Sequence, residues 1–231
     1  YECFIKYSGD GRHLVVYKYD RESAIKVMEA IFQVSAEDCP YHYHLYLSGM
    51  RWPFMELYAA YEDIGAVEKQ KSLKEFYFKS YQAVRTRGTP PLTEDEREKM
   101  FEKDLTFAKM NFYYSDMSYL ATQTGKFDVA ARYKRLQVES YKRGIKMGLQ
   151  EGNPNKPTYE QRMAKGEKFM KEWLPAEARK AGVRLWPWEA AGGWNFWLAD
   201  LIEEVKHKWQ EIILLAVCIA AGIVGLVDDA E

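Results

Sequence analysis

The run of sixteen residues from Ile212 to Val227 (IILLAVCIAAGIVGLV) carries no charge, and it constrains the fold more than any other feature. Such a stretch needs a non-aqueous neighbour, which is either a lipid bilayer or the centre of a large core. Ten of the sixteen residues are Ile, Leu or Val, and each contributes about −0.3 to −0.6 kcal/mol at the centre of a membrane helix. The run is short, since at about 1.5 Å per residue it covers roughly 24 Å of a hydrocarbon layer about 30 Å thick.

The flanks of this run favour a membrane span over the alternatives, a buried helix or an interfacial hairpin. Cations and a tryptophan precede it and acids follow it: Lys206, His207, Lys208 and Trp209, then Asp228, Asp229 and Glu231. Cations on one side only orient a single span, and an interfacial tryptophan anchors it. We therefore predict one C-terminal transmembrane helix, with residues 1–205 on the matrix, stromal or cytoplasmic side. Its anchor positions are Trp209, Ile212, Leu215, Ile219, Ile223 and Val227.

The predicted span also offers a packing surface of small residues. These are Ala216, Ala220, Ala221, Gly222 and Gly225. Small residues four positions apart let helix backbones approach closely in lipid, so we expect this face to pack on helices of neighbouring proteins. The run holds no ionisable side chain that would serve a proton relay, which argues against a transport path.

Outside this run the composition is that of a water-soluble domain. Charged residues make up 29% of the 231-residue chain, and the formal net charge is −1, which excludes nucleic-acid binding as its main function. The cysteines, Cys3, Cys39 and Cys218, form no disulfide framework, so we expect a reducing compartment. The chain begins at Tyr1 rather than Met, which we interpret as the loss of a leader such as an organellar presequence.

Hydrophobic patterning predicts a mainly α fold with a small N-terminal β-hairpin over residues 3–19. Helical pairs follow: residues 55–65 with 69–87, and a helix from a Thr93–Glu96 capping box to 122 with one over 127–147. A last helix over 159–174 ends before Pro175. We divide the chain into an N-terminal hairpin, helix and aromatic segment (1–53), a helical domain (54–175), a Trp-rich linker and amphipathic helix (176–210), and the anchor with its acidic tail (211–231).

Four of the seven tryptophans lie within twelve residues, at Trp186, Trp188, Trp194 and Trp197. Apolar residues at helical spacing follow them and lead directly to the uncharged run. Because tryptophan prefers the headgroup layer, we predict that these four residues are interfacial aromatics at a membrane surface. The alternative is a Trp-rich core segment.

A shift of sixty residues aligns the two helical pairs, with Gly65 on Gly125 and Lys74 on Lys134. Around these glycines, large and small apolar residues recur: Leu57, Tyr61 and Val67, then Met117, Phe127 and Ala130. This pattern resembles a tetratricopeptide hairpin, and the resemblance covers about a third of the chain. It implies an all-helical surface that binds proteins. The spacing of sixty rather than about thirty-four residues, the two lysines at apolar positions and the missing closing proline depart from that family, and generic helix packing gives the same pattern.

The sequence contains no recognisable catalytic motif. Cys39, His42 and His44 resemble metal ligands but lack a fourth partner, so we predict no metal site and no cofactor. His207 near the span is read as an anchor-flank residue rather than a haem or quinone ligand. No P-loop, dinucleotide fingerprint, nucleophile elbow or HExxH motif occurs. We expect neither an enzyme nor a small-molecule substrate.

These observations predict an accessory structural subunit of a large mitochondrial inner-membrane complex, either a respiratory complex or the ATP synthase. It would be single-pass, with its helical domain in the matrix, and its partners would be other subunits and the lipid bilayer. One alternative is an accessory subunit of a thylakoid complex. Another is a tail-anchored, tetratricopeptide-like adaptor that recruits soluble proteins, although basic residues often follow such anchors and this tail is acidic.

Overall fold

The computed structural model describes residues 4–7, 14–17, 25–26, 29, 51–84 and 90–210, and the prediction of a mainly α chain is confirmed. Strand β1 (Phe4–Tyr7) pairs antiparallel with β2 (Leu14–Tyr17), with Phe4 opposite Tyr17. The helices are α3 (Arg51–Asp63), α4 (Val67–Val84), α5 (Glu94–Ala108), α6 (Tyr114–Gln123), α7 (Phe127–Lys146), α8 (Tyr159–Lys168), α9 (Leu174–Lys180) and α10 (Pro187–Ala190). A further helix covers residues 194–210.

Side chains cap the starts of α5 and α8 in the same way. The Glu96 amide donates to Thr93 Oγ1 at 3.3 Å, and the Thr93 amide donates to Glu96 Oε2 at 2.8 Å, so the predicted capping box is confirmed. Thr158 and Gln161 form a second box before α8. Each box satisfies two backbone donors that the first turn of a helix leaves without partners.

The two predicted helical pairs, α3 with α4 and α6 with α7, turn through the same backbone motif. Gly65 and Gly125 have φ of +69° and +72°, a conformation that favours glycine. In each turn the residue after the glycine donates its amide to a carbonyl five residues back, Ala66 to Tyr61 and Lys126 to Ala121, both at 2.9 Å. This is the Schellman arrangement. The two turns are therefore alike in geometry, whereas common ancestry of the pairs stays a prediction.

Two helices are interrupted by a π-helical turn without ending. The π segment η2 (Lys109–Tyr113) joins α5 to α6, and η3 (Phe169–Trp173) joins α8 to α9. The prediction that the last helix ends before Pro175 is wrong, because helical structure continues to Lys180. The π turn explains this: the Leu174 amide donates to the carbonyl of Phe169, five residues back, and Pro175 enters at the first turn of α9, where proline is tolerated.

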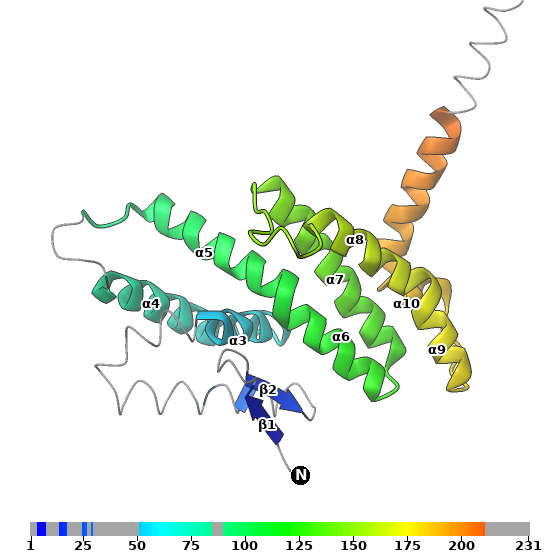
Figure 1. The fold of residues 1–231 in the computed structure, drawn as a ribbon, viewed down its shortest axis with the longest axis horizontal. Helices are drawn as coiled ribbons and strands as arrows, with labels where there is room; N and C mark the ends of the chain where they lie inside the picture. The colour runs from blue at the N-terminus through cyan, green and yellow to red at the C-terminus, as the bar shows by residue number, and fades with distance from the viewer. Residues whose placement is uncertain are drawn as a thin grey trace, which may run out of the picture.

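Helix α7 lies at the centre of the described part of the molecule. It contacts α5, α6, α8, α9, α10 and both π segments. In Figure 1 the continuous α5–α6 helix crosses the molecule, with α3 and α4 on one side and α7, α8 and α9 on the other. Apolar residues of α3, α4, α5 and α7 form the largest core cluster, which includes Met55, Leu57, Phe101 and Tyr133. A second cluster joins α6, α7 and α9 through Phe127, Ala130 and Leu174.

The predicted transmembrane helix, residues 212–227, lies outside the described residues, and so do Cys39, His42 and His44. Within the part that is described, none of the helices combines the length and the apolar character that crossing a bilayer requires.

Candidate functional site

The feature that sets this molecule apart from a closed helical bundle is the helix over residues 194–210. It follows the Gly192–Gly193 turn, and in Figure 1 it leaves the body beside α10 and points away from it. All residues from Leu198 to Gln210 are exposed. The structure describes this helix as far as Gln210, two residues before the uncharged run that begins at Ile212. Its base lies on the folded body, and the helix leads toward the predicted anchor.

An arginine on α7 fastens the base of this helix to the body. The guanidinium of Arg135 donates to both carboxylate oxygens of Asp200, at 2.9 and 2.8 Å. Its Nε lies 3.1 Å from Glu139 Oε1, and its Cζ lies 5.0 Å from the centre of the Phe196 ring. The Arg135 side chain is only 10% exposed. A two-pronged contact of this kind fixes orientation as well as distance, so the helix is held at a defined angle to α7.

Gly192 lets the turn approach Arg135 closely. Its φ is +92°, and a Cβ at this position would lie 2.6 Å from the Arg135 Cβ and 3.3 Å from the Ala131 carbonyl oxygen. No real Cβ contact is that short, so only glycine allows this approach. Arg135 therefore takes part in both the close contact with Gly192 and the ion pair with Asp200.

We call the contact of Arg135 with Asp200 the joint. The four clustered tryptophans form one stack beside it. The rings of Trp186 and Trp188 are 5.2 Å apart and nearly parallel, and Trp188 stacks on Trp194 at 4.5 Å. Trp197 packs edge-on against Trp194 at 5.3 Å. The Arg184 guanidinium covers the stack at Trp186, 3.8 Å from the ring centre. Much of the aromatic surface is thus covered by other aromatic rings, and Trp194, 57% exposed, is the most exposed of the four.

Exposed apolar side chains continue from Trp194 along the helix. We call this set the apolar stripe: Trp194, Leu198, Leu201, Ile202, Val205 and Trp209. Trp209, at the far end, is 60% exposed. A continuous apolar stripe on a soluble surface is typical of a contact with lipid or protein.

Comparisons with protein-family models, with curated proteins and with solved structures find no match to this chain. No family is therefore assigned. The chemistry of the site rests on the residues themselves.

The structure brings the four predicted interfacial tryptophans together and places Trp209 on the same helix as Trp194 and Trp197. The other predicted anchor residues and the predicted packing face lie beyond residue 210, outside the described residues. Sequence reasoning missed Arg135 and Asp200. They are sixty-five positions apart, and neither belongs to a motif, so no signal in a single sequence connects them.

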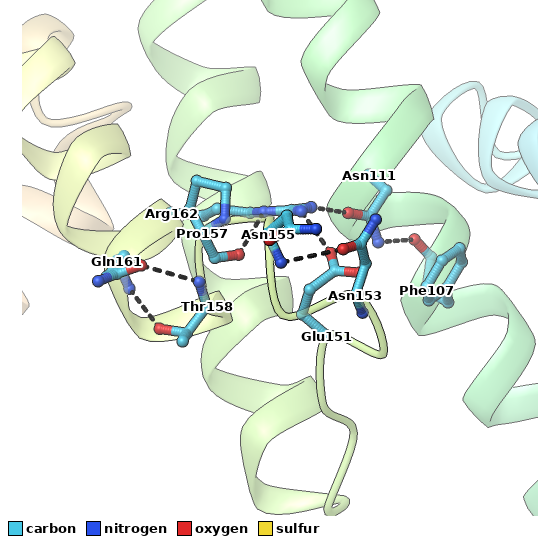
Figure 2. A network of polar contacts seen from close by, with 9 residues as sticks. All are labelled: Phe107, Asn111, Glu151, Asn153, Asn155, Pro157, Thr158, Gln161 and Arg162. Carbon is cyan, nitrogen blue, oxygen red and sulfur yellow. Dashed lines mark hydrogen bonds and ion pairs between the residues drawn. The ribbon is translucent and has the colours of Figure 1, made fainter.

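A second polar network joins the loop before α8 to the π segment η2 (Figure 2). Arg162 donates to Asn111 Oδ1 at 2.7 Å and to the Pro157 carbonyl at 3.1 Å, and it pairs with Glu151 through a short contact. Asn111 in turn donates to the Phe107 carbonyl at 3.1 Å. The guanidinium donors are thus directed at groups of this chain, and we assign the network a structural role that fixes the loop onto α5 and η2.

Two ionisable groups on the helical body have displaced pKa values. Burial, together with the nearby charge of Asp116, raises the pKa of the Glu56 carboxyl to about 8. Burial lowers the pKa of the Lys134 ammonium to about 8 against the opposing charge of Asp116, and the ammonium donates to Gln137 Oε1 at 2.8 Å. Perturbed values occur in active sites and in structural cores alike. In the described part of the chain, no set of three His, Cys, Asp or Glu residues could hold a metal ion.

Proposed function

We propose that this protein is a non-catalytic accessory subunit of a large mitochondrial inner-membrane complex, a respiratory complex or the ATP synthase. In this proposal the chain keeps a small N-terminal hairpin, a matrix-side helical body and one C-terminal membrane helix. The observation that carries it is the contact between Arg135 and Asp200, which holds a helix that leaves the body and is described as far as Gln210, two residues before the uncharged run. A joint with two hydrogen bonds suits a part that must be held in position.

Charge around the run supports the matrix-side orientation. Lys206 and Lys208 precede it, and Asp228 and Asp229 follow it. Cations remain preferentially on the side from which a span is inserted. In this proposal the helical body lies on the matrix side, and the acidic residues after the run lie on the other side of the membrane.

The polar groups of the body support a scaffold rather than an enzyme. Buried carboxylates serve contacts between helices: Tyr77 donates to Asp104 at 2.6 Å, joining α4 to α5. Asp63 on α3 accepts from the hydroxyls of Tyr113 and Tyr133, on η2 and α7. Groups used in this way stabilise one arrangement of helices.

Isolation of the native assembly tests the proposal. Membranes from the source cells are solubilised in mild detergent and separated by native electrophoresis. We expect the protein to migrate with other subunits in a high-mass complex and to resist extraction by alkaline carbonate. Recovery only as a free monomer, or release from the membranes by carbonate, would contradict the proposal.

A matched pair of variants makes the test specific to the span. Replacement of Ile219 and Ile223 by lysine places two charges in the uncharged run and should release the protein from the membrane, since each charge near a helix centre costs roughly 2.5–3.5 kcal/mol. The same double replacement at the exposed positions Glu203 and His207 should leave it in the membrane fraction.

Protease access distinguishes the adaptor alternative. A matrix-side body is protected in intact mitochondria and remains protected after the outer membrane is ruptured. Digestion of the body in intact mitochondria would favour a tail-anchored adaptor instead.

A further inference from the structure

We propose that the helix over residues 194–210 lies along the membrane surface, with its apolar stripe in the lipid interface and Lys206 and Lys208 at the headgroup phosphates. It would be a second membrane contact, additional to the span. The inference rests on the proposed function to the extent that the span keeps this helix at a membrane.

The stripe occupies one narrow face of the helix. Counted from Leu198 at about 100° per residue, Leu201 lies at about −60° and Ile202 at about +40°. The other members of the stripe fall between these two limits. An apolar arc of about 100° that carries Leu, Ile, Val and two Trp is the pattern of a helix lying in a membrane interface.

The folded body lies on the opposite face. Phe196 and Asp200, the two residues that contact Arg135, both lie at about 160° from Leu198 on the same wheel. From Leu198 onward the stripe therefore points away from α7, whereas Trp194, 57% exposed, also stacks on Trp188 of α10. A flat surface can approach the stripe there without displacing α7.

Two lysines border the stripe, one on each side. Lys206 lies at about +80° and Lys208 at about −80°, with the acidic residues Glu203 and Glu204 further round the helix. Lysine at such a boundary extends its ammonium to the phosphate layer while its stem stays in apolar surroundings. Their present partners, Glu203 at 3.3 Å and Glu204 at 2.7 Å, are exposed ion pairs. Such pairs contribute little and exchange readily.

An upright helix would leave most of the stripe in water. Leu198 precedes Ile212 by fourteen residues, which is roughly 21 Å along the axis. The headgroup layer on each side of a bilayer is only about 5–8 Å thick. In the upright arrangement Leu198 and Ile202 would thus stand above the membrane, whereas a helix lying on the surface covers the whole stripe.

The two ends of the stripe favour lipid over a second helix as the occupant. Trp194 and Trp209 are the most exposed large apolar side chains of the described helix, and they lie in its first turn and in the last turn that the structure describes. Tryptophan concentrates at the interface between hydrocarbon and water because its ring is apolar and its N–H needs a polar partner. Tryptophan in both of these turns favours a helix with both turns at that interface.

Spin-label depth measurements on the protein with its uncharged run in place test this inference. In a background of Cys3→Ser, Cys39→Ser and Cys218→Ala, single nitroxides are attached at Leu198→Cys, Ile202→Cys and Val205→Cys. Controls on the opposite face of the same helix are Glu203→Cys and His207→Cys, and Ile219→Cys reports the span. The protein is reconstituted into vesicles of phosphatidylcholine and phosphatidylglycerol, and collisions with oxygen and with a water-soluble nickel chelate are compared.

We expect the three stripe labels to collide more with oxygen than with nickel, at similar depths, and the two control labels to do the reverse. A gradient from lipid at 205 to water at 198 would overturn the inference in favour of an upright helix. Strong spin–spin broadening at the stripe labels would overturn it in favour of contact with a second copy.

The span label separates the two proposals. If 219 lies deep in lipid while the stripe labels lie in water, only the present inference fails. If 219 also lies in water, the proposed membrane anchoring fails with it. In protein labelled at 202, Lys206→Glu combined with Lys208→Glu should move the label toward water, and an unchanged depth would refute the headgroup contact.

Discussion

Single residues decide how the helix over 194–210 is attached. Arg135 contacts Asp200, Glu139 and Phe196, and Gly192 lies against its Cβ. Because the Arg135 side chain contacts four neighbours, we expect substitutions beside it to lower the free energy of unfolding more than the same substitutions elsewhere.

Gly192→Ala should destabilise the protein more than Gly182→Ala. Both glycines have positive φ, +92° and +72°, so both alanines carry a backbone cost of about 1–2 kcal/mol. Only the Cβ at 192 also collides with Arg135, and overpacking adds about 1–3 kcal/mol. Denaturant unfolding in detergent measures the difference, and equal losses for the two variants would refute the close approach.

Glu56 gives the stability a pH dependence whose direction can be stated. Its folded-state pKa of about 8 lies above the ordinary value of 4.5, so the folded state keeps a proton that the unfolded state releases. The stabilisation that comes from this bound proton is complete below about pH 4.5 and is lost as the pH rises through 8. Between these values the free energy of unfolding falls by at most about 1.4 kcal/mol per pH unit. Glu56→Gln should flatten this decline between pH 5 and 8 in denaturant unfolding, and an unchanged decline would contradict the raised pKa of Glu56.

At the scale of helices, the sequence predicts where helices start and turn better than where a π segment interrupts them. The Thr93–Glu96 box and the turns at Gly65 and Gly125 depend on local residue types, so a single sequence reveals them. The π segments have no such local signature. Pro175 indicates a helix end by sequence, yet η3 carries the helix through it. The joint of Arg135 with Asp200 depends on two elements that only the complete fold brings together.

The π segment η2 is supported by a side chain from the central helix α7. Gln137 donates its amide to the Met110 carbonyl at 2.7 Å, and both residues are buried. Gln137→Leu would leave this carbonyl without that donor and would remove the Oε1 acceptor of the Lys134 ammonium, at a cost of at least about 1–3 kcal/mol in the free energy of unfolding. Gln150→Leu, at an exposed position, is the matched control. A change of less than about 0.5 kcal/mol at 137 would show that η2 does not need this hydrogen bond.

For the molecule as a whole, the described core lies upstream of the helix over 194–210. The buried apolar residues extend from Ile25 to Ala178. Removal of residues 211–231 should therefore leave the helical circular-dichroism signal and the unfolding midpoint nearly unchanged, while the protein moves from the membrane to the soluble fraction. Loss of the cooperative transition would mean that the C-terminal residues complete the core.

The contact of Arg135 with Asp200 also transmits any rotation of the helix over 194–210 to the body. The seventeen described residues from 194 to 210 span roughly 25 Å along the helix axis, so a rotation of about 10° at the base would displace Gln210 by roughly 4 Å. A force that tilts this helix would act through the same contact on α7, and α7 contacts nearly every other described helix of the body. In the proposed membrane-bound arrangement, a change in bilayer thickness or in a neighbouring protein would therefore reach the body first at the guanidinium of Arg135.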